Sequence, residues 1–154
     1  MLGMKLRFNW MGFIIFMLPM LINFVYFALA RNTEQPEQGM VSRGIELIEQ
    51  GTRILYAILI CLLVSQQKVD WKSPLFYGAV AFLILYYIVW IRYFMGGMEQ
   101  GLMTKSFLFI PIPLAVFPVL YYLLSAIWLH NCGAAIVMVI FGVAHNIVSR
   151  QAML

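Results

Sequence analysis

The stretch "RGIELIEQGTRILYAILICLLV", residues 43–64, joins a charged half to an apolar half. Its apolar half begins at Ile54 and has about 11 residues, which is too few to cross a bilayer because a spanning helix needs roughly 20. The half before it carries Arg43, Glu46, Glu49, Gln50 and Arg53. The stretch therefore spans a membrane only if one helix extends back through the charged half. Otherwise residues 40–53 form a helix that lies at the membrane surface.

The composition of the whole chain indicates an integral membrane protein. Of 154 residues, 64% are hydrophobic and 10% are charged, and the mean hydropathy is +0.90. A soluble domain has roughly 45–50% apolar and about 25% charged residues. The net charge of +4 comes from scattered basic residues, so no basic stripe for nucleic acid exists. The two cysteines, Cys61 and Cys132, form no metal or redox motif.

Five apolar segments are candidate transmembrane helices: residues 10–30, about 43–66, 74–96, 106–129 and 133–151. Their apolar runs are continuous, which favours helices over the alternating pattern of a β-barrel. We expect an all-α fold, a polytopic transmembrane helical bundle of about five spans that forms a single domain over residues 1–154. Lys5 and Arg7 resemble the start of a signal peptide, but the following run is longer than the usual apolar region of one, so we expect a retained first helix.

Prolines predict local departures from straight helices. Pro111 and Pro113 disfavour helical geometry for the residues before them, so the fourth span should break near 110–113 and bend again near Pro118. In the first span, Pro19 removes the amide that would bond the carbonyl of Ile15.

The orientation is not decided by charge. One side of the membrane would carry Lys5, Arg7, Lys68 and Lys72, and the other side would carry Arg31, Arg43, Lys105 and Arg150. Four positive charges face four, so the positive-inside rule does not distinguish the two orientations. We place the N-terminus inside because the first helix usually dominates.

The charged half of the opening stretch forms a stripe on a helix. At helical periodicity, Arg43, Glu46, Gln50 and Arg53 fall within about 80° of one another, and Glu49 lies beside them. Glu49 and Arg53 have the i,i+4 spacing of an ion pair. Ionisable groups at membrane depth usually face a bundle interior or a wet cavity. Alternatively, the first two turns are solvated and Arg53 extends toward the headgroups.

Two further polar residues lie within apolar segments. Asn23 follows Pro19 by one turn, and His145 lies in the last span. Each has two interpretations: Asn23 binds a ligand or bonds a neighbouring helix, and His145 relays a proton or lies at the membrane interface. We predict that Glu46, Arg53 and at least one of Asn23 and His145 meet in one polar cluster. The candidate binding residues are Asn23, Glu46, Glu49, Gln50, Arg53 and His145. No motif predicts a metal site or a cofactor.

The segments "LPMLIN", "GIELIEQGTR", "YYIVWIRY", "IPIPLAVFPVLYYL" and "FGVAHNIVS" occur in an order and at a spacing that resemble a known family. It is a family of small uncharacterised five-span integral membrane proteins of anaerobic Gram-positive bacteria. The resemblance covers about residues 10–150 and matches the family pattern at Glu49, Gln50, Arg53 and His145. The family has proline directly followed by asparagine, whereas here "MLI" separates Pro19 from Asn23. The resemblance implies five spans in a bacterial cytoplasmic membrane and implies no mechanism.

Three functions remain open. The first is a membrane protein that binds or transports a small polar or ionic solute, as a homodimer or with a partner subunit because five spans are few for a transporter. The second is a membrane-embedded enzyme acting on a lipid or isoprenoid, with Glu46 or Glu49 as base and His145 as acid. No recognised catalytic motif supports it, so we lean against an enzyme. The third is a structural or immunity-type protein that packs against a partner. Burial of residues 43–53 favours the first two.

Overall fold

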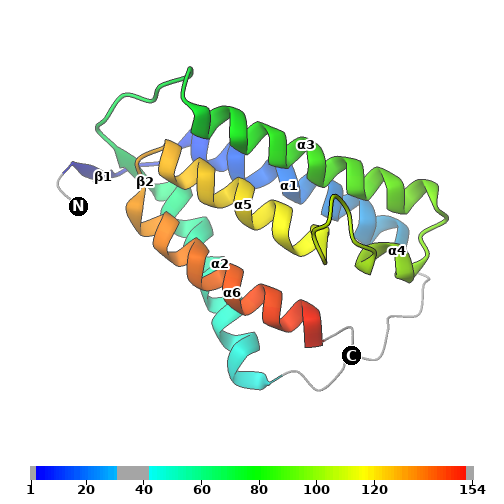
Figure 1. The fold of residues 1–154 in the computed structure, drawn as a ribbon. Coiled ribbons are helices and arrows are strands. Elements are labelled where there is room, and N and C mark those ends of the chain that lie inside the picture. Colours follow the sequence, from blue (N-terminus) through cyan, green and yellow to red (C-terminus); the bar gives the residue numbers. More distant parts are fainter. Residues whose placement is uncertain (1–2, 31–41, 152–154) are drawn as a thin grey trace.

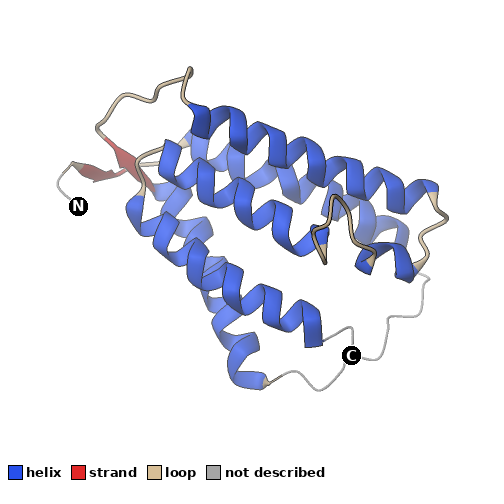
Figure 2. Cartoon of the chain, viewed as in Figure 1, coloured by secondary structure: helices blue, strands red, loops and turns tan. Residues whose placement is uncertain are grey.

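The computed structural model describes residues 3–30 and 42–151. The predicted loop 31–42, with Arg31, lies outside the described residues except for Ser42. The described residues form six helices and two short strands (Figure 1, Figure 2). In chain order they are β1 (Met4–Leu6), α1 (Trp10–Leu29), α2 (Arg43–Leu62), β2 (Leu63–Ser65), α3 (Pro74–Met95), α4 (Gln100–Thr104), α5 (Pro113–Trp128) and α6 (Cys132–Gln151).

The long helices form two groups that share α5. Helix α5 packs against α3 on one side and against α6 on the other, and α6 packs against α2. Figure 1 shows α1, α3 and α5 lying together, while α2 and α6 diverge from them away from the β1–β2 end. The strands β1 and β2 pair antiparallel, with Lys5 opposite Val64. This ribbon was not expected from the sequence.

Among the described residues, three helices are long and apolar enough to cross a membrane: α1, α3 and α6. They correspond to the predicted segments 10–30, 74–96 and 133–151. Helix α3 begins as its sequence predicts, because the Ser73 side chain accepts a hydrogen bond from the Leu75 amide and Pro74 occupies the first helical position. These three helices indicate a membrane protein.

Helix α2 runs without interruption from Arg43 to Leu62, so the prediction that it begins before Glu46 is confirmed. It ends about four residues earlier than expected, and its last carbonyls are bonded from two other parts of the chain. Buried Asn131 donates to the carbonyl of Leu59 at 2.9 Å and accepts from the Ala134 amide at 3.0 Å. One side chain thus caps the end of α2 and the start of α6.

The N-terminal segment bonds the next carbonyls of α2. The Asn9 side chain donates to the carbonyl of Ile60, and the amides of Asn9 and Arg7 donate to those of Cys61 and Leu62. The last carbonyls of α2 are therefore satisfied by donors from other parts of the protein.

The prediction of a helix over 106–129 is wrong for residues 106–112. Leu108, Phe109 and Ile112 have positive φ, and α5 begins only at Pro113. The physical reason is that Pro111 and Pro113 each exclude helical geometry from the residue before them. Helix α5 has 16 residues, about 24 Å, which is shorter than the bilayer's hydrocarbon core of about 30 Å. A bend at Pro118 stays a prediction.

Arg92, on the last turn of α3, holds the segment between α4 and α5. Its guanidinium donates to the carbonyls of Leu102, Lys105 and Ser106 at 2.9–3.4 Å and lies over the Phe107 ring at 5.4 Å. A planar group with five donors suits this clustering of unpaired carbonyls at the end of a short helix.

Tyrosine hydroxyls satisfy the backbone around Pro19. Tyr121 donates to the carbonyl of Ile15 at 2.9 Å, the carbonyl that Pro19 leaves without its helical donor. Tyr122 donates to the carbonyl of Phe16 at 2.8 Å, and Tyr87 donates to that of Leu18. Pro19 frees only the carbonyl of Ile15, so Tyr121 of α5 supplies the donor that this carbonyl lacks. The bonds of Tyr122 and Tyr87 add further contacts from α5 and α3 to α1.

A substitution at Gly12 tests how closely α1 approaches the end of α2. A Cβ at this position would lie 1.9 Å from the carbonyl oxygen of Ile60, which is backbone and cannot rotate away. We expect Gly12→Ala to lower the free energy of unfolding by about 1–3 kcal/mol, the usual effect of overpacking. Denaturation in mixed micelles measures this change.

Gly51→Ala is the matched control, since a Cβ at Gly51 meets no atom within 4 Å. It should leave stability unchanged or raise it by up to about 1 kcal/mol through helix propensity. Equal effects of the two substitutions would contradict the close contact between α1 and α2.

Candidate functional site

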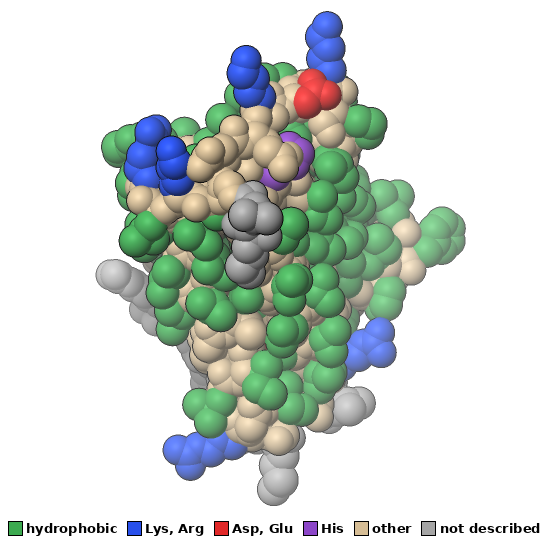
Figure 3. Space-filling view, turned by 90° about the vertical axis from the view of Figure 1, so that its left-hand side faces the viewer, with side chains coloured by type: hydrophobic (Ala, Val, Ile, Leu, Met, Phe, Trp, Pro, Cys, Tyr) green, Lys and Arg blue, Asp and Glu red, His purple; other side chains and the backbone are tan. Residues whose placement is uncertain are grey.

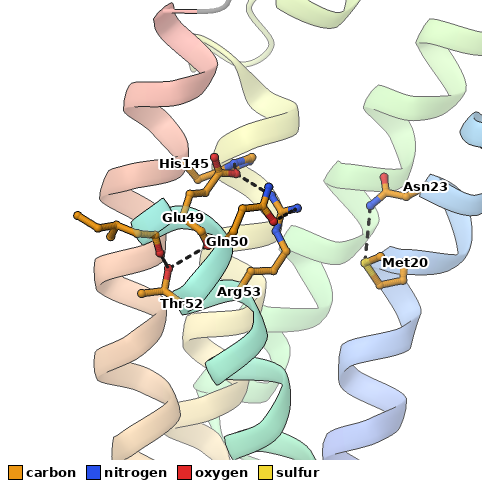
Figure 4. Close-up of polar contacts among 8 residues, drawn as sticks. Met20, Asn23, Glu49, Gln50, Thr52, Arg53 and His145 are labelled. Atoms are coloured by element: carbon orange, nitrogen blue, oxygen red, sulfur yellow. Dashed lines mark hydrogen bonds and ion pairs between the residues drawn. The ribbon is translucent and has the colours of Figure 1, made fainter. Parts of the chain in front are cut away.

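A buried carboxylate joins α2 to α6. The Glu49 side chain is 6% exposed, and its Oε1 accepts from Arg53 Nη2 at 2.6 Å and from His145 Nδ1 at 2.8 Å (Figure 4). Arg53 is on the same helix and His145 is on α6. The three side chains form a cluster, here called the Glu49 cluster, between two packed helices.

The sequence spacing and one aromatic ring hold this geometry. Glu49 and Arg53 lie one turn apart on α2, so their charged groups meet on the same face. The Phe141 ring stacks on the His145 imidazole, with centroids 5.0 Å apart and planes 14° apart. The guanidinium carbon of Arg53 lies 5.6 Å above the same ring. Phe141 thus contacts both hydrogen-bond partners of the carboxylate, the imidazole by stacking and the guanidinium by a cation–π contact.

The contact to Glu49 determines the hydrogen position on a neutral His145. An ionised carboxylate only accepts hydrogen bonds, so Nδ1 must carry the proton. In the neutral ring Nε2 is then an acceptor. Within the part of the chain that the structure describes, neither His145 Nε2 nor Glu49 Oε2 has a hydrogen-bond partner.

The cluster opens outward through Arg53. Its side chain is 46% exposed and that of His145 is 23% exposed, so solvent or a ligand reaches both. Gln50 is exposed and accepts from Arg53 Nη1 at 3.5 Å. The arrangement offers a cation, a carboxylate oxygen and an imidazole nitrogen within one site.

The structure separates two of the predicted site residues, Glu46 and Asn23, from this cluster. Among the described residues, the Glu46 side chain makes no hydrogen bond or ion pair, so the expected Glu46–Arg53 contact is wrong. Glu49, which lies about one turn from Glu46 on the buried face of α2, pairs with Arg53 instead. Asn23 lies apart on α1, where its oxygen accepts from Tyr86 at 2.9 Å and its amide meets Met20 (Figure 4). Only Arg53 and His145 of the predicted group meet, and Glu49 links them.

Sequence reasoning missed Phe141 and the tyrosines that line the bundle interior. The signal for Phe141 was its i,i+4 spacing to His145, and the signal for Tyr121 was the carbonyl freed by Pro19. In residues 3–30 and 42–151, no group of three His, Cys, Asp or Glu side chains is arranged to hold a metal ion.

No family model matches the chain, and the comparisons with curated proteins and with solved structures found no similar protein. The resemblance to the family of five-span membrane proteins stays a prediction.

Replacing Glu49 tests the cluster's contribution to stability. Glu49→Gln keeps the shape but removes the charge that both donors bond, so we expect the free energy of unfolding to fall by about 1–3 kcal/mol. Glu46→Gln, on the same helix, should change it by less than about 0.5 kcal/mol. Unfolding of both variants in mixed micelles makes the comparison, and equal losses would contradict a special role for Glu49.

Proposed function

We propose that the chain is a five-span integral membrane protein that binds a small zwitterionic or ionic solute at the Glu49 cluster and carries it across the membrane. The observation that supports this most is that the two oxygens of the Glu49 carboxylate differ in their hydrogen-bond partners. One oxygen holds Arg53 and His145, and the other has no partner among the described residues. We infer a bacterial cytoplasmic membrane from the family resemblance, and a homodimer or a partner subunit from the small number of helices.

The outer face of α2 supports the proposal that α2 spans the membrane in addition to α1, α3 and α6. Leu47 and Ile54 are 66% and 61% exposed, and the apolar side chains of Ile48, Leu55 and Ile58 are exposed beside them. The charged Glu49 faces inward toward α6. An apolar outer face with an inward-facing charge is the pattern of a membrane helix that packs its polar groups inside the protein.

The outer surface of the molecule agrees with this layout. In Figure 3, charged side chains and a histidine lie along the upper part of the face, further basic side chains lie at its lower left and on its right, and hydrophobic side chains cover much of its flanks. The fifth span would be α5, with the segment 106–112 completing the depth that its 16 residues do not reach.

Each open atom of the cluster suits one part of a zwitterion. The exposed guanidinium of Arg53 has donors left for a carboxylate or phosphate, because Glu49 and Gln50 occupy only two of them. The unpartnered Glu49 Oε2 suits an ammonium group. The acceptor Nε2 of His145 suits a proton that leaves or enters with the solute.

One observation favours an enzyme as the second candidate. A carboxylate that holds Nδ1 of a histidine and leaves Nε2 open is the arrangement of a general base. That function requires an acidic hydrogen of a substrate or of a water molecule within hydrogen-bond reach of Nε2, and a lipid or isoprenoid is the substrate class that reaches this depth. A protein that works only by docking to a partner has less support, because Glu49 is buried rather than displayed.

Binding of small charged probes tests the proposal. In lipid nanodiscs, glycine should raise the melting temperature in a saturable way, and acetate or methylamine alone should do so far less, because each has one of the two charges. Arg53→Met should abolish the effect of glycine. Arg43→Met, an exposed arginine on the same helix, should keep it.

The outcomes separate the candidates. If neither glycine nor larger amino acids bind wild-type protein more tightly than the two single-charge probes, the zwitterion is the wrong ligand. If binding occurs but proteoliposomes accumulate no labelled solute, transport is wrong and binding remains.

A further inference from the structure

A second site lies on the outside of the bundle, between α5 and α6. It is a groove of about 460 Å³ with Val119 and Leu123 of α5 on one side and Val143 of α6 on the other. Gly142 lies at its floor, where a Cβ would come within 2.6 Å of Val119. The missing side chain lets the two helices approach and keeps the groove open. None of these residues belongs to the Glu49 cluster.

The groove faces the lipid phase. Val143 is 60% exposed on α6, one of the three helices apolar enough to cross a membrane. A groove on such a surface is filled by an apolar chain, because leaving it empty forfeits dispersion contacts along both walls. Its volume lies in the range of sites that hold a small organic ligand.

One end of the groove is polar and positively charged. Arg150, in the last turn of α6, lines it and is exposed. Within residues 3–30 and 42–151 it has no acidic partner. One turn deeper, Asn146 donates to the carbonyl of Gly142 at 2.8 Å. A primary amide carries two N–H groups, so a second donor remains for a ligand.

The order of these groups along α6 matches one class of molecule. From the helix end inward they are a cation at Arg150, an amide donor at Asn146 and an apolar wall at Val143. Arg150 and Asn146 are four residues apart, which is about 6 Å along the axis. A phospholipid presents a phosphate, then ester carbonyls, then an acyl chain in the same order. A fatty acid has its only polar group at one depth.

We propose that this groove binds an anionic phospholipid of the surrounding bilayer, with its phosphate at Arg150, an ester carbonyl at Asn146 and one acyl chain between α5 and α6. The preference for a net negative headgroup comes from Arg150, since a zwitterionic headgroup carries its own cation. One arginine near an anionic membrane surface gives about a fivefold preference.

Native mass spectrometry of the protein in detergent, with phosphatidylglycerol and phosphatidylcholine added together, measures the preference directly. Wild-type protein should retain phosphatidylglycerol about fivefold over phosphatidylcholine. Arg150→Gln should remove the preference, and Arg43→Gln should keep it. Val143→Trp, which fills the groove, should reduce retention of both lipids.

Two controls keep the outcome interpretable. Ile84→Trp places the same bulk on the exposed face of α3 and should leave lipid retention unchanged. Melting temperatures without added lipid identify any variant that fails to fold. The proposal is overturned if Arg150→Gln and Arg43→Gln behave alike, if Val143→Trp retains both lipids fully, or if palmitate displaces phosphatidylglycerol at equal concentration.

Discussion

The structure depends on satisfying backbone carbonyls from inside the protein. Away from water an unpaired carbonyl costs several kcal/mol, and this chain leaves carbonyls without a helical donor at Ile15, one turn before Pro19, and at the end of α2. The Tyr121 hydroxyl of α5 bonds the carbonyl of Ile15, and Asn131 with the N-terminal segment bonds those of α2. These hydrogen bonds join α5 to α1, and they join Asn131 and the N-terminal segment to the end of α2. The helices are thus held together where their own backbone bonding is interrupted.

The same constraint acts on charge in the Glu49 cluster. A carboxylate that is 5% exposed requires donors, and it takes one from its own helix and one from α6. That requirement sets the register of α2 against α6. It leaves Glu49 Oε2 and His145 Nε2 without a partner among the described residues. Stability and the proposed solute site thus arise from one residue. The groove proposed for a lipid lies on another side of α6 and depends on Gly142 instead, so the two sites are separable by substitution.

Periodicity and hydropathy predicted the helices of the three apolar spans and the continuity of α2, because these follow from local sequence. They failed at residues 63–65, where pairing with β1 replaced the last turn of a helix. Hydropathy alone also extended a helix over residues 106–112, whereas the two prolines predicted a break near 110–113, and α5 begins only at Pro113. For the site, spacing identified Glu49 and Arg53, but it could not choose between Glu46 and Glu49. That choice depends on how α6 rotates against α2, which the sequence of one helix does not contain.

The central claim is that Glu49 accepts a hydrogen bond from Nδ1 of His145 and leaves Nε2 open. Nitrogen NMR of the imidazole tests it most directly, in lipid and in the His130→Asn variant, so that His145 gives the only histidine signal. Asparagine suits position 130 because His130 has a positive φ. Once the ring is neutral, the account predicts a protonated Nδ1 and a bare Nε2. A neutral ring that carries its hydrogen on Nε2 would contradict it.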